Sequence, residues 1–232
     1  MKRDFDNFDE FAEDYRDTHN SAIKLSGADS DYFSEYKIIE VAKNEQHQET
    51  LKILDFGCGD GNSVVFFRKH FKESYIEGID VSQASIDIAA DKKIDRTKFQ
   101  VFDGKIIPYE NDSFDIIFTS MVFHHIEHKL HKAIISEIYR VLKPQGRFYM
   151  FEHNPYNPLT RRVVDQCEFD RDAVLLKPKY GKQIISLGGF DKFNLNFTIF
   201  IPRLKIIQWA LRLENYLKWL PIGAQYYIRA IK

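Results

Sequence analysis

Three glycines at alternate positions mark the first place where this chain could hold a ligand closely. Gly57, Gly59 and Gly61 stand in the segment DFGCGDG, which follows the apolar run LKIL. A residue without a Cβ atom lets the backbone turn sharply and approach a ligand. Asp55 opens the segment and offers a carboxylate to a positively charged group. The pattern predicts a ligand-binding loop, and a plain structural turn is the alternative.

Two more carboxylates follow the next two apolar runs in chain order. Asp80 ends the run SYIEGID, about twenty residues beyond the glycines, where α/β nucleotide-binding folds place an acid that binds ribose hydroxyls. Phe102 and Asp103 end the third run, where a ring can pack on adenine and a carboxylate can accept a hydrogen bond from its amino group. A helix-capping role next to Ser82 is the alternative for Asp80. The three run ends together indicate a ligand that contains adenosine.

Histidines and one glutamate follow the fourth and fifth apolar runs. They are His124, His125, Glu152 and His153. The imidazole group titrates near neutral pH and suits a residue that takes a proton from a substrate. We take His125 and His153 as the candidate catalytic residues, His125 first, with packing or a loop hydrogen bond as the alternative role of each. Four histidines fall within residues 124–131, but no carboxylate–histidine spacing beside them indicates a metal site.

Apolar runs alternate with helical segments from residue 51 onward. Short runs bounded by turn residues predict buried strands, and apolar residues three or four positions apart predict helices. The expected strands are 51–56, 74–80, 98–104, 113–120, 146–153, 193–201 and 224–231. The expected helices are 32–42, 63–70, 81–93, a segment from about 130 that Pro144 and Gly146 end, and 203–220. In 81–93, Ser82 is the expected N-cap, and Ile86, Ala89 and Ala90 form the expected inner face. The alternation predicts a doubly wound α/β fold with a mainly parallel sheet, which binds ligands at the carboxyl ends of its strands.

The motifs at these strand ends resemble those of the class I S-adenosylmethionine-dependent methyltransferases. DFGCGDGN is similar to their cofactor loop, GIDVS to their ribose-binding segment and VFDG to their adenine contact. FDIIFTSMVFHHI and VLKPQGRFYM resemble their fourth-strand and fifth-strand motifs. The resemblance covers residues 51–151, and the carboxyl-terminal segment is similar to a small-molecule branch related to quinone-biosynthesis methyltransferases.

This resemblance implies a fold, a cofactor and a set of contact residues. It implies seven strands with the last one antiparallel, and amino-terminal helices that close as a lid over S-adenosyl-L-methionine. Phe11, Tyr15 and His19 share one face of such a helix. The implied cofactor-binding residues are Tyr15, Asp55, Gly57, Cys58, Gly59, Asp80, Val81, Phe102, Asp103, Gly104, Thr119 and Ser120.

The expected activity is methyl transfer to a small-molecule acceptor, at oxygen. Relatives that methylate amino groups of DNA bases or glutamine carry an Asn/Asp-Pro-Pro-aromatic motif after the fourth strand, where this chain has SMVF. The adjacent Arg161 and Arg162 suit a phosphate or carboxylate, which favours an anionic acceptor. A rigid loop with solvated arginines is the alternative, and a neutral, lipid-like acceptor then remains open. A nicotinamide-dependent oxidoreductase is one alternative. Its dinucleotide-binding fingerprint needs a third glycine at position 62, where this chain has Asn62, and this argues against it. A protein that binds S-adenosylmethionine without turning it over is the other.

Composition limits the partners of the chain. Its 232 residues carry a net charge of −1, which supplies no global field for nucleic acid. Two cysteines form neither a disulfide framework nor a zinc set, and no apolar run reaches the length of a membrane span. We therefore expect a cytoplasmic protein without an amino-terminal signal. The apolar face of the expected helix 203–220 is predicted to pack against the sheet or a substrate cap rather than on a membrane surface.

A single methyltransferase domain over residues 1–232 is the expected organisation. Within it, residues 1–50 form the helical lid and residues 51–153 form the cofactor-binding core. Residues 154–232 form a substrate-side segment and the last two strands.

Overall fold

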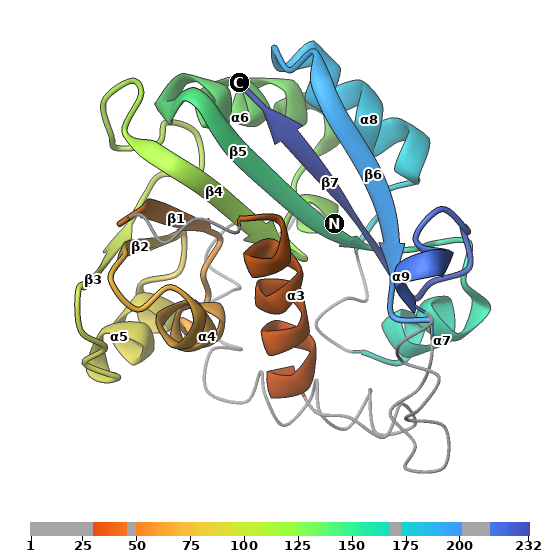
Figure 1. Cartoon of the computed structure of the whole chain (residues 1–232), viewed down its shortest axis with the longest axis horizontal. Coiled ribbons are helices and arrows are strands. Elements are labelled where there is room, and N and C mark those ends of the chain that lie inside the picture. The colour runs from red at the N-terminus through yellow and green to blue at the C-terminus, as the bar shows by residue number, and fades with distance from the viewer. Residues whose placement is uncertain (1–29, 46–49, 168–172, 201–213) are drawn as a thin grey trace.

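A seven-stranded sheet forms the centre of the computed structural model, which describes residues 30–45, 50–167, 173–200 and 214–232 (Figure 1). The strands are β1 (Lys52–Phe56), β2 (Tyr75–Asp80), β3 (Thr97–Val101), β4 (Phe114–Ser120), β5 (Leu142–His153), β6 (Lys192–Thr198) and β7 (Gln225–Ile231). The helices are α3 (Ser30–Asn44), α4 (Asn62–His70), α5 (Gln83–Asp91), α6 (His128–Val141), α7 (Pro158–Gln166), α8 (Pro178–Leu187) and α9 (Glu214–Leu217).

The strand order is β3-β2-β1-β4-β5-β7-β6, and it confirms the predicted doubly wound sheet. Each neighbouring pair from β3 to β5 is parallel. β7 runs antiparallel to both of its neighbours, β5 and β6, as the resemblance implies. The order in which successive strands are added to the sheet reverses between β1 and β4, so the loops after these parallel strands leave in opposite directions and can bind a ligand between them.

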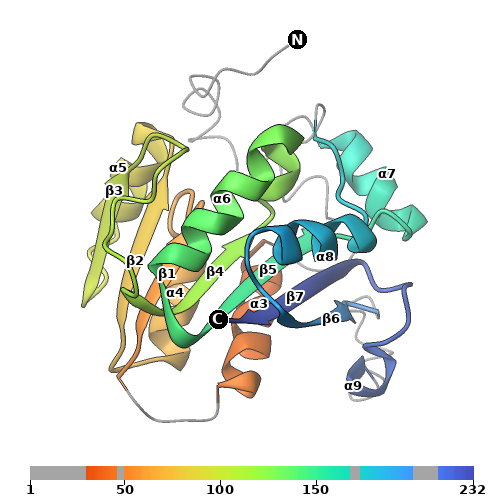
Figure 2. The ribbon, with the colours of Figure 1, turned by 90° about the horizontal axis from the view of Figure 1, so that it is seen from above.

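Helices cover both faces of the sheet (Figure 2). α6 and α8 pack on one face, where Ile138 and Ile184 join a cluster with Leu54 of β1. α3 and α4 pack on the other face, where Ile38 and Phe67 lie in a second cluster. The strands are therefore buried on both faces, which explains their nearly continuous apolar sequences.

The start of α5 agrees with the sequence in its cap and differs in its inner face. The Ser82 side chain accepts a hydrogen bond from the Ser85 amide at 3.1 Å, which confirms the predicted N-cap. Ile86 and Ala89 are buried as expected, but Ala90 is exposed. Successive residues of a helix point about 100° apart, so the face that buries Ala89 turns Ala90 toward solvent.

The end of α6 differs from the prediction that Pro144 and Gly146 stop it. The helix ends at Val141 and β5 begins with the next residue, so both predicted stop residues lie inside the strand. Leu142 is already extended and pairs with Phe114 of β4. A residue that precedes proline disfavours helical geometry, which moves the boundary upstream of Pro144.

The expected helix 203–220 lies largely outside the described residues. Only residues 214–220 of it are described, and Tyr216 on α9 is exposed, so packing on the sheet is wrong at this residue. Packing against a substrate cap stays a prediction. In the described ranges no helix is both long enough and apolar enough to cross a membrane.

Helix α3 forms hydrogen bonds and ion pairs with the rest of the molecule along its length. The Tyr36 hydroxyl donates to Glu214 Oε2 at 2.9 Å, and Lys218 Nζ lies 2.6 Å from Glu40 Oε2. Beyond its last turn, Glu45 accepts a hydrogen bond from the Tyr149 hydroxyl. α3 confirms the helix expected at 32–42, and its contacts make it part of the scaffold. The lid helix expected before it lies outside the described residues.

Candidate functional site

The glycine loop after β1 folds against β2 and leaves space on its outer side. The amides of Gly57 and Cys58 both donate to the Ile79 carbonyl, at 2.8 and 3.0 Å. Gly57 and Gly59 have φ angles of +73° and +51°, which glycine adopts without strain. A Cβ atom on Gly57 would lie 2.4 Å from a methyl group of Val122, whereas one on Gly59 would meet no atom within 4 Å in the described structure. The backbone at Gly59 therefore borders open space.

Asp80 ties this loop to the end of β2. Its Oδ2 accepts a hydrogen bond from the Gly59 amide at 2.8 Å, and its Oδ1 accepts one from the Ser82 amide at 3.0 Å. The carboxylate thus takes part in the start of α5, the alternative raised by the sequence. Each carboxylate oxygen has a second lone pair, so these bonds leave acceptor capacity for a ribose hydroxyl.

Asp55 is a buried carboxyl group beside the loop. Its side-chain Oδ2 has no hydrogen-bond partner within the described residues. Burial, and the nearby charge of Asp80, raise the pKa of Asp55 to about 8. A buried polar atom left without a partner is costly, so an occupant that hydrogen-bonds to Asp55 is favoured.

Lys37 of α3 reaches the same site, and sequence reasoning missed it. Its Nζ donates to Ser120 Oγ at 2.7 Å at the end of β4. Burial lowers the pKa of Lys37 to about 8, while the charges of Glu152 and Asp55 oppose that shift. The only sequence signal is a lysine among the apolar positions of a helix, and its partner lies 83 positions away.

The adenine side of the site lies at the ends of β2 and β3. Val81 directly follows β2, and the Phe102 ring lies 5.4 Å from the Phe56 ring, centroid to centroid. Asp103 is exposed, and its Oδ1 accepts the amides of Lys105 and Ile106 at 2.8 and 2.9 Å. These hydrogen bonds lower the pKa of Asp103.

Glycines and one cysteine shape the floor of this region. Gly104 continues the turn after Asp103 with a φ angle of +74°. Cys58 is buried, and a Cβ atom on Gly78 would lie 2.8 Å from its sulfur, so its side chain packs toward the sheet. Burial raises the pKa of the Cys58 thiol and keeps it protonated. Any cofactor contact of Cys58 would thus come from its backbone.

The end of β4 is strained and buried. Thr119 is fully buried, and its hydroxyl has no hydrogen-bond partner in the part of the chain that the structure describes. Met121 follows with a φ angle of +60°, a conformation that is uncommon for a residue with a side chain. Strain of this kind is found at functional sites, where the surrounding structure enforces it.

Glu152 and His124 form a buried pair at the ends of β5 and β4. His124 Nδ1 lies 2.6 Å from Glu152 Oε2, and both side chains are 0% exposed. The Phe123 amide donates to the other carboxylate oxygen at 2.9 Å. The rings of His125 and His153 lie 4.2 and 5.4 Å from the His124 ring. The structure thus brings the two candidate catalytic histidines together around the Glu152–His124 pair.

His131 of α6 fixes the short 3₁₀ helix, Phe123–His125, that carries two of these histidines. Its Nε2 lies 3.0 Å from the carbonyl oxygens of Phe123 and Ile126, and its Nδ1 lies 3.0 Å from the Tyr180 hydroxyl. Carbonyls accept only, so Nε2 carries the proton. Burial lowers the pKa of His131 and favours the neutral ring. No group of histidines, cysteines and carboxylates suited to a metal occurs among the described residues.

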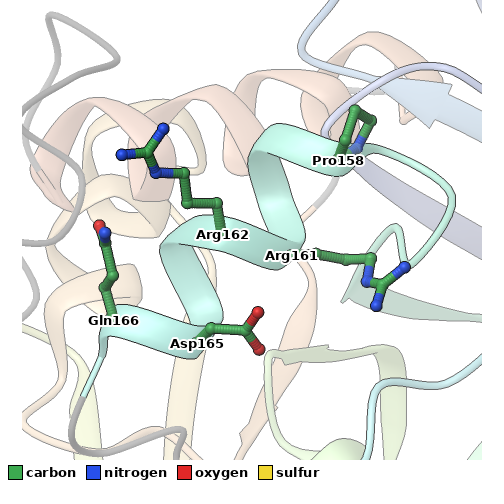
Figure 3. Close-up of a pocket in the computed structure, with 5 residues that line it drawn as sticks. All are labelled: Pro158, Arg161, Arg162, Asp165 and Gln166. Carbon is green, nitrogen blue, oxygen red and sulfur yellow. The ribbon is translucent and has the colours of Figure 1, made fainter.

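Helix α7 lines a shallow hollow of about 310 Å³ with Pro158, Arg161, Arg162, Asp165 and Gln166 (Figure 3). Figure 3 shows that the side chains of Arg161 and Arg162 point to different sides of the helix. The two guanidinium groups therefore do not converge on one anion from this helix. Tyr15, the remaining predicted contact residue, lies outside the described residues.

Fold and site together define a class of protein. The parallel strands place a glycine loop, a carboxylate after β2 and an aromatic–acid pair after β3 at one edge of the sheet, in the order that the resemblance requires. The last strand is antiparallel. This is the architecture of a class I S-adenosylmethionine-dependent methyltransferase.

Comparison with known proteins gives the family. Residues 53–146 match the family model "Methyltransferase domain". The chain is 30% identical over 148 residues to 27-O-demethylrifamycin SV methyltransferase of Amycolatopsis mediterranei, a match over 62% of this chain and 50% of the relative. Residues 53–146 therefore form a methyltransferase domain of the S-adenosylmethionine-dependent type, whose cofactor is S-adenosyl-L-methionine. It spans about half the length of the curated relatives it matches.

Solved structures share the whole fold. A Thermotoga maritima structure described as "possible histamine N-methyltransferase" superposes with a TM-score of 0.69 at 17% identity, over 97% of this chain and 98% of the other. Haemonchus contortus phosphoethanolamine N-methyltransferase 2, with phosphomonomethylethanolamine and S-adenosylhomocysteine, gives a TM-score of 0.67 at 18% identity, over 99% of this chain and 60% of the other. The names of these relatives include methylation at oxygen and at nitrogen, so family membership does not fix the methylated atom.

Proposed function

We propose that the chain transfers a methyl group from S-adenosylmethionine to a small-molecule acceptor. One observation carries this proposal: the Gly59 backbone borders open space, and the buried Oδ2 of Asp55, at the end of the strand before this loop, has no hydrogen-bond partner among the described residues. Asp80 suits the ribose, Asp55 suits the amino group, and Lys37 offers a positive charge to the carboxylate of the methionine end. The bound cofactor supplies a methyl group on a positively charged sulfur.

Methyl transfer by in-line displacement needs the acceptor to be oriented and water to be excluded. An acceptor hydroxyl also loses a proton as the new oxygen–carbon bond forms. His125 is partly exposed and lies against the His124 ring, so we assign the proton acceptor to His125. His124 is held by Glu152 and has no exposed side-chain surface, which suits it to position His125. The His153 ring lies 5.4 Å from the His124 ring, and His153 is the second candidate.

An anionic acceptor is the finer part of the proposal. Arg161 and Arg162 are exposed on α7, which follows β5 by one short turn. Each guanidinium can bind a phosphate or carboxylate in a two-point geometry. Because the two side chains diverge, we propose that a single arginine binds the acceptor, and that the two single substitutions therefore have unequal effects.

A turnover assay tests the activity. The protein is incubated with S-adenosylmethionine and fractionated metabolite pools, and methylated products are identified by mass spectrometry. A methylated product excludes a binding protein without turnover. Absence of any product, together with tight cofactor binding, would favour that alternative. Once an acceptor is found, His125→Ala should lower kcat, because a proton acceptor acts in the transition state. Arg161→Ala or Arg162→Ala should raise the acceptor KM and leave cofactor affinity unchanged.

We further propose one domain in which residues 1–50 include a lid, with Tyr15 contacting the cofactor. Residues 51–153 supply the cofactor-binding core and residues 154–232 the acceptor side. Closure over a cofactor excludes water and slows amide exchange. We expect hydrogen exchange in residues 5–30 to slow when S-adenosylhomocysteine is added, while exchange in α3 changes little. Equal protection of residues 5–30 with and without the ligand would contradict the lid.

A further inference from the structure

Five large apolar side chains are exposed on two segments at the carboxyl end of β5 and the start of β7. They are Tyr156, Leu159, Tyr216, Trp219 and Ile222, and we call them the aromatic end. Trp219 is 74% exposed, Tyr216 77% and Leu159 68%. Scattered single apolar residues need no explanation, but a group on adjoining segments marks an interaction site.

Side-chain hydrogen bonds lock the two segments of the aromatic end together. Asn157 Nδ2 donates to the Ile222 carbonyl at 2.7 Å, and Asn154 Nδ2 donates to the carbonyls of Pro221 and Gly223 at 3.1 and 2.7 Å. The Thr160 hydroxyl donates to the Ala224 carbonyl at 2.9 Å. The turn before α7 and the turn after α9 therefore form one rigid support, and the apolar side chains on it are presented in a fixed arrangement.

Positive charge lies on α7, the helix that also carries Leu159. Arg161 and Arg162 on α7 are exposed, and within the described ranges neither forms an ion pair. Asp165 is the acidic residue on the same helix. Lys218, by contrast, is engaged with Glu40. The aromatic end thus combines tryptophan, tyrosine and aliphatic side chains with free guanidinium groups.

We propose that the aromatic end docks the protein on an anionic lipid surface. Tryptophan and tyrosine rings settle at the headgroup level of a bilayer, where one end is apolar and the other is hydrated. Exposed arginines are attracted by anionic headgroups, so the charge of this surface complements that of the membrane. A second copy bound through the same patch would instead bring the arginines of both copies together.

Docking in this way has a consequence for the site. The aromatic end begins three residues after His153, at the carboxyl edge where β4 and β5 present their histidines. A lipid surface bound there lies next to the acceptor side of the sheet. The proposal concerns a surface separate from the cofactor loop, so flotation can be tested independently of cofactor binding.

Vesicle flotation tests the docking. The full chain is mixed with phosphatidylcholine vesicles, or with vesicles in which about one third of the lipid is phosphatidylglycerol, and floated through a sucrose gradient. We expect flotation with the anionic vesicles that weakens as salt is raised. The double variant Trp219→Ser with Ile222→Ser should bind at least about tenfold more weakly, because two side chains that enter the interface are lost. Arg161→Gln with Arg162→Gln should reduce the preference for anionic vesicles by about fivefold or more.

A matched control uses equally exposed apolar residues elsewhere. Tyr75 and Ile106 are 54% and 64% exposed on the β2–β3 side of the sheet, and Tyr75→Ser with Ile106→Ser should float like the wild type. Equal flotation of the Trp219/Ile222 variant and the wild type would overturn the proposal, as would failure of the wild type to float.

A second copy of this chain is the competing occupant of the aromatic end, and its binding would give a different experimental result. A dimer in sedimentation velocity that the Trp219/Ile222 variant abolishes, without any flotation of the wild type, would overturn the proposal in favour of a second copy. Calorimetric titration with S-adenosylmethionine should give the same affinity for this variant and the wild type. A chain that floats but does not bind the cofactor would refute the proposed function alone.

Discussion

The two sides of the candidate site are built on different principles. At the ends of β1 and β2 the site is formed by the backbone: Gly59 borders open space, and Asp80 accepts hydrogen bonds from the amides of Gly59 and Ser82. At the ends of β4 and β5 the site is formed by side chains: Glu152 and His124 are paired at 2.6 Å, and other histidines pack against them. We call the first side, with Gly59 and Asp80, the cradle, because its fixed backbone borders the space for a ligand. We call the second side, with Glu152, His124 and the histidines packed against them, the network, because each side chain depends on the others for its position.

This difference predicts that substitutions on the two sides will change different quantities. A change on the first side should mainly lower cofactor affinity where the new side chain meets open space, as at Gly59, and should also lower the free energy of unfolding where it meets packed atoms, as at Gly57. A change in the network should lower the free energy of unfolding, because it leaves a buried charge or hydrogen-bonding group without a partner.

The largest effect is expected for Glu152→Ala. It removes the partner of His124 and of the Phe123 amide in a fully buried setting, so the free energy of unfolding should fall by about 3 kcal/mol. Urea denaturation measures this change. Glu152→Gln is the control, because its side-chain carbonyl can still accept from the Phe123 amide, and it should lose less. An alanine variant as stable as the wild type would mean that the pair is not a structural unit.

The next effect separates two neighbouring glycines. A side chain at Gly57 must displace Val122, so Gly57→Ala should lower the free energy of unfolding by about 2 kcal/mol. A side chain at Gly59 meets no atom within 4 Å, but a valine is strained at the φ angle of +51°. Gly59→Val should therefore cost some stability, keep the fold and weaken S-adenosylmethionine binding by at least about tenfold, roughly 1.4 kcal/mol. Urea denaturation and calorimetric titration measure the two quantities. Unchanged cofactor affinity in Gly59→Val would show that the cradle is not part of the cofactor site.

Asp80 joins the cradle to the cofactor, and Asp80→Ala is expected to weaken cofactor binding by a similar factor, at least about tenfold. The variant also releases the amides of Gly59 and Ser82, so a modest loss of stability accompanies it. Asp80→Asn is the matched control, because its carbonyl oxygen can still accept one amide. If both variants bind S-adenosylmethionine as tightly as the wild type, Asp80 serves only the loop and α5.

The smallest effect concerns the pH dependence of stability. The pKa of His131 is lower in the folded protein than in the unfolded chain, because the ring is buried. The unfolded chain therefore binds a proton first as pH falls below about 6.5, which favours unfolding. We expect stability to decline below that pH and to decline less in His131→Phe, although this variant also loses the bonds to the 3₁₀ helix. Parallel pH slopes of the two proteins would show that His131 does not contribute.

The cradle could be predicted from sequence and the network could not. Gly59 and Asp80 lie within 21 positions of each other, on adjacent strands that the alternation of apolar runs already places side by side. Ser82 likewise caps the helix that begins at the next residue, so this contact is also close in sequence. These features depend on short-range geometry, which the order of residues records directly.

Long-range contacts decide the rest. Lys37 is separated from Ser120 by 83 positions, and a lysine in a helix gives no sign that it will be buried at the end of a distant strand. Sequence placed Glu152 and His124 among four candidates, but their pairing depends on the registration of β4 against β5. The early end of α6 has the same origin, because Leu142 pairs with Phe114 before Pro144 is reached.

The burial of Lys37 next to Asp55 has a thermodynamic consequence for ligand binding. Both groups have a pKa of about 8, so each is only partly ionised in mildly alkaline solution. A zwitterionic ligand that places its carboxylate at the ammonium group and its amino group at the carboxylate would stabilise both ionised forms. Binding would then draw a proton to Lys37 and release one from Asp55, and any imbalance between the two passes to the buffer. Where uptake by Lys37 and release from Asp55 are unequal, the heat measured on binding would change with the ionisation enthalpy of the buffer, while the affinity at a given pH would not.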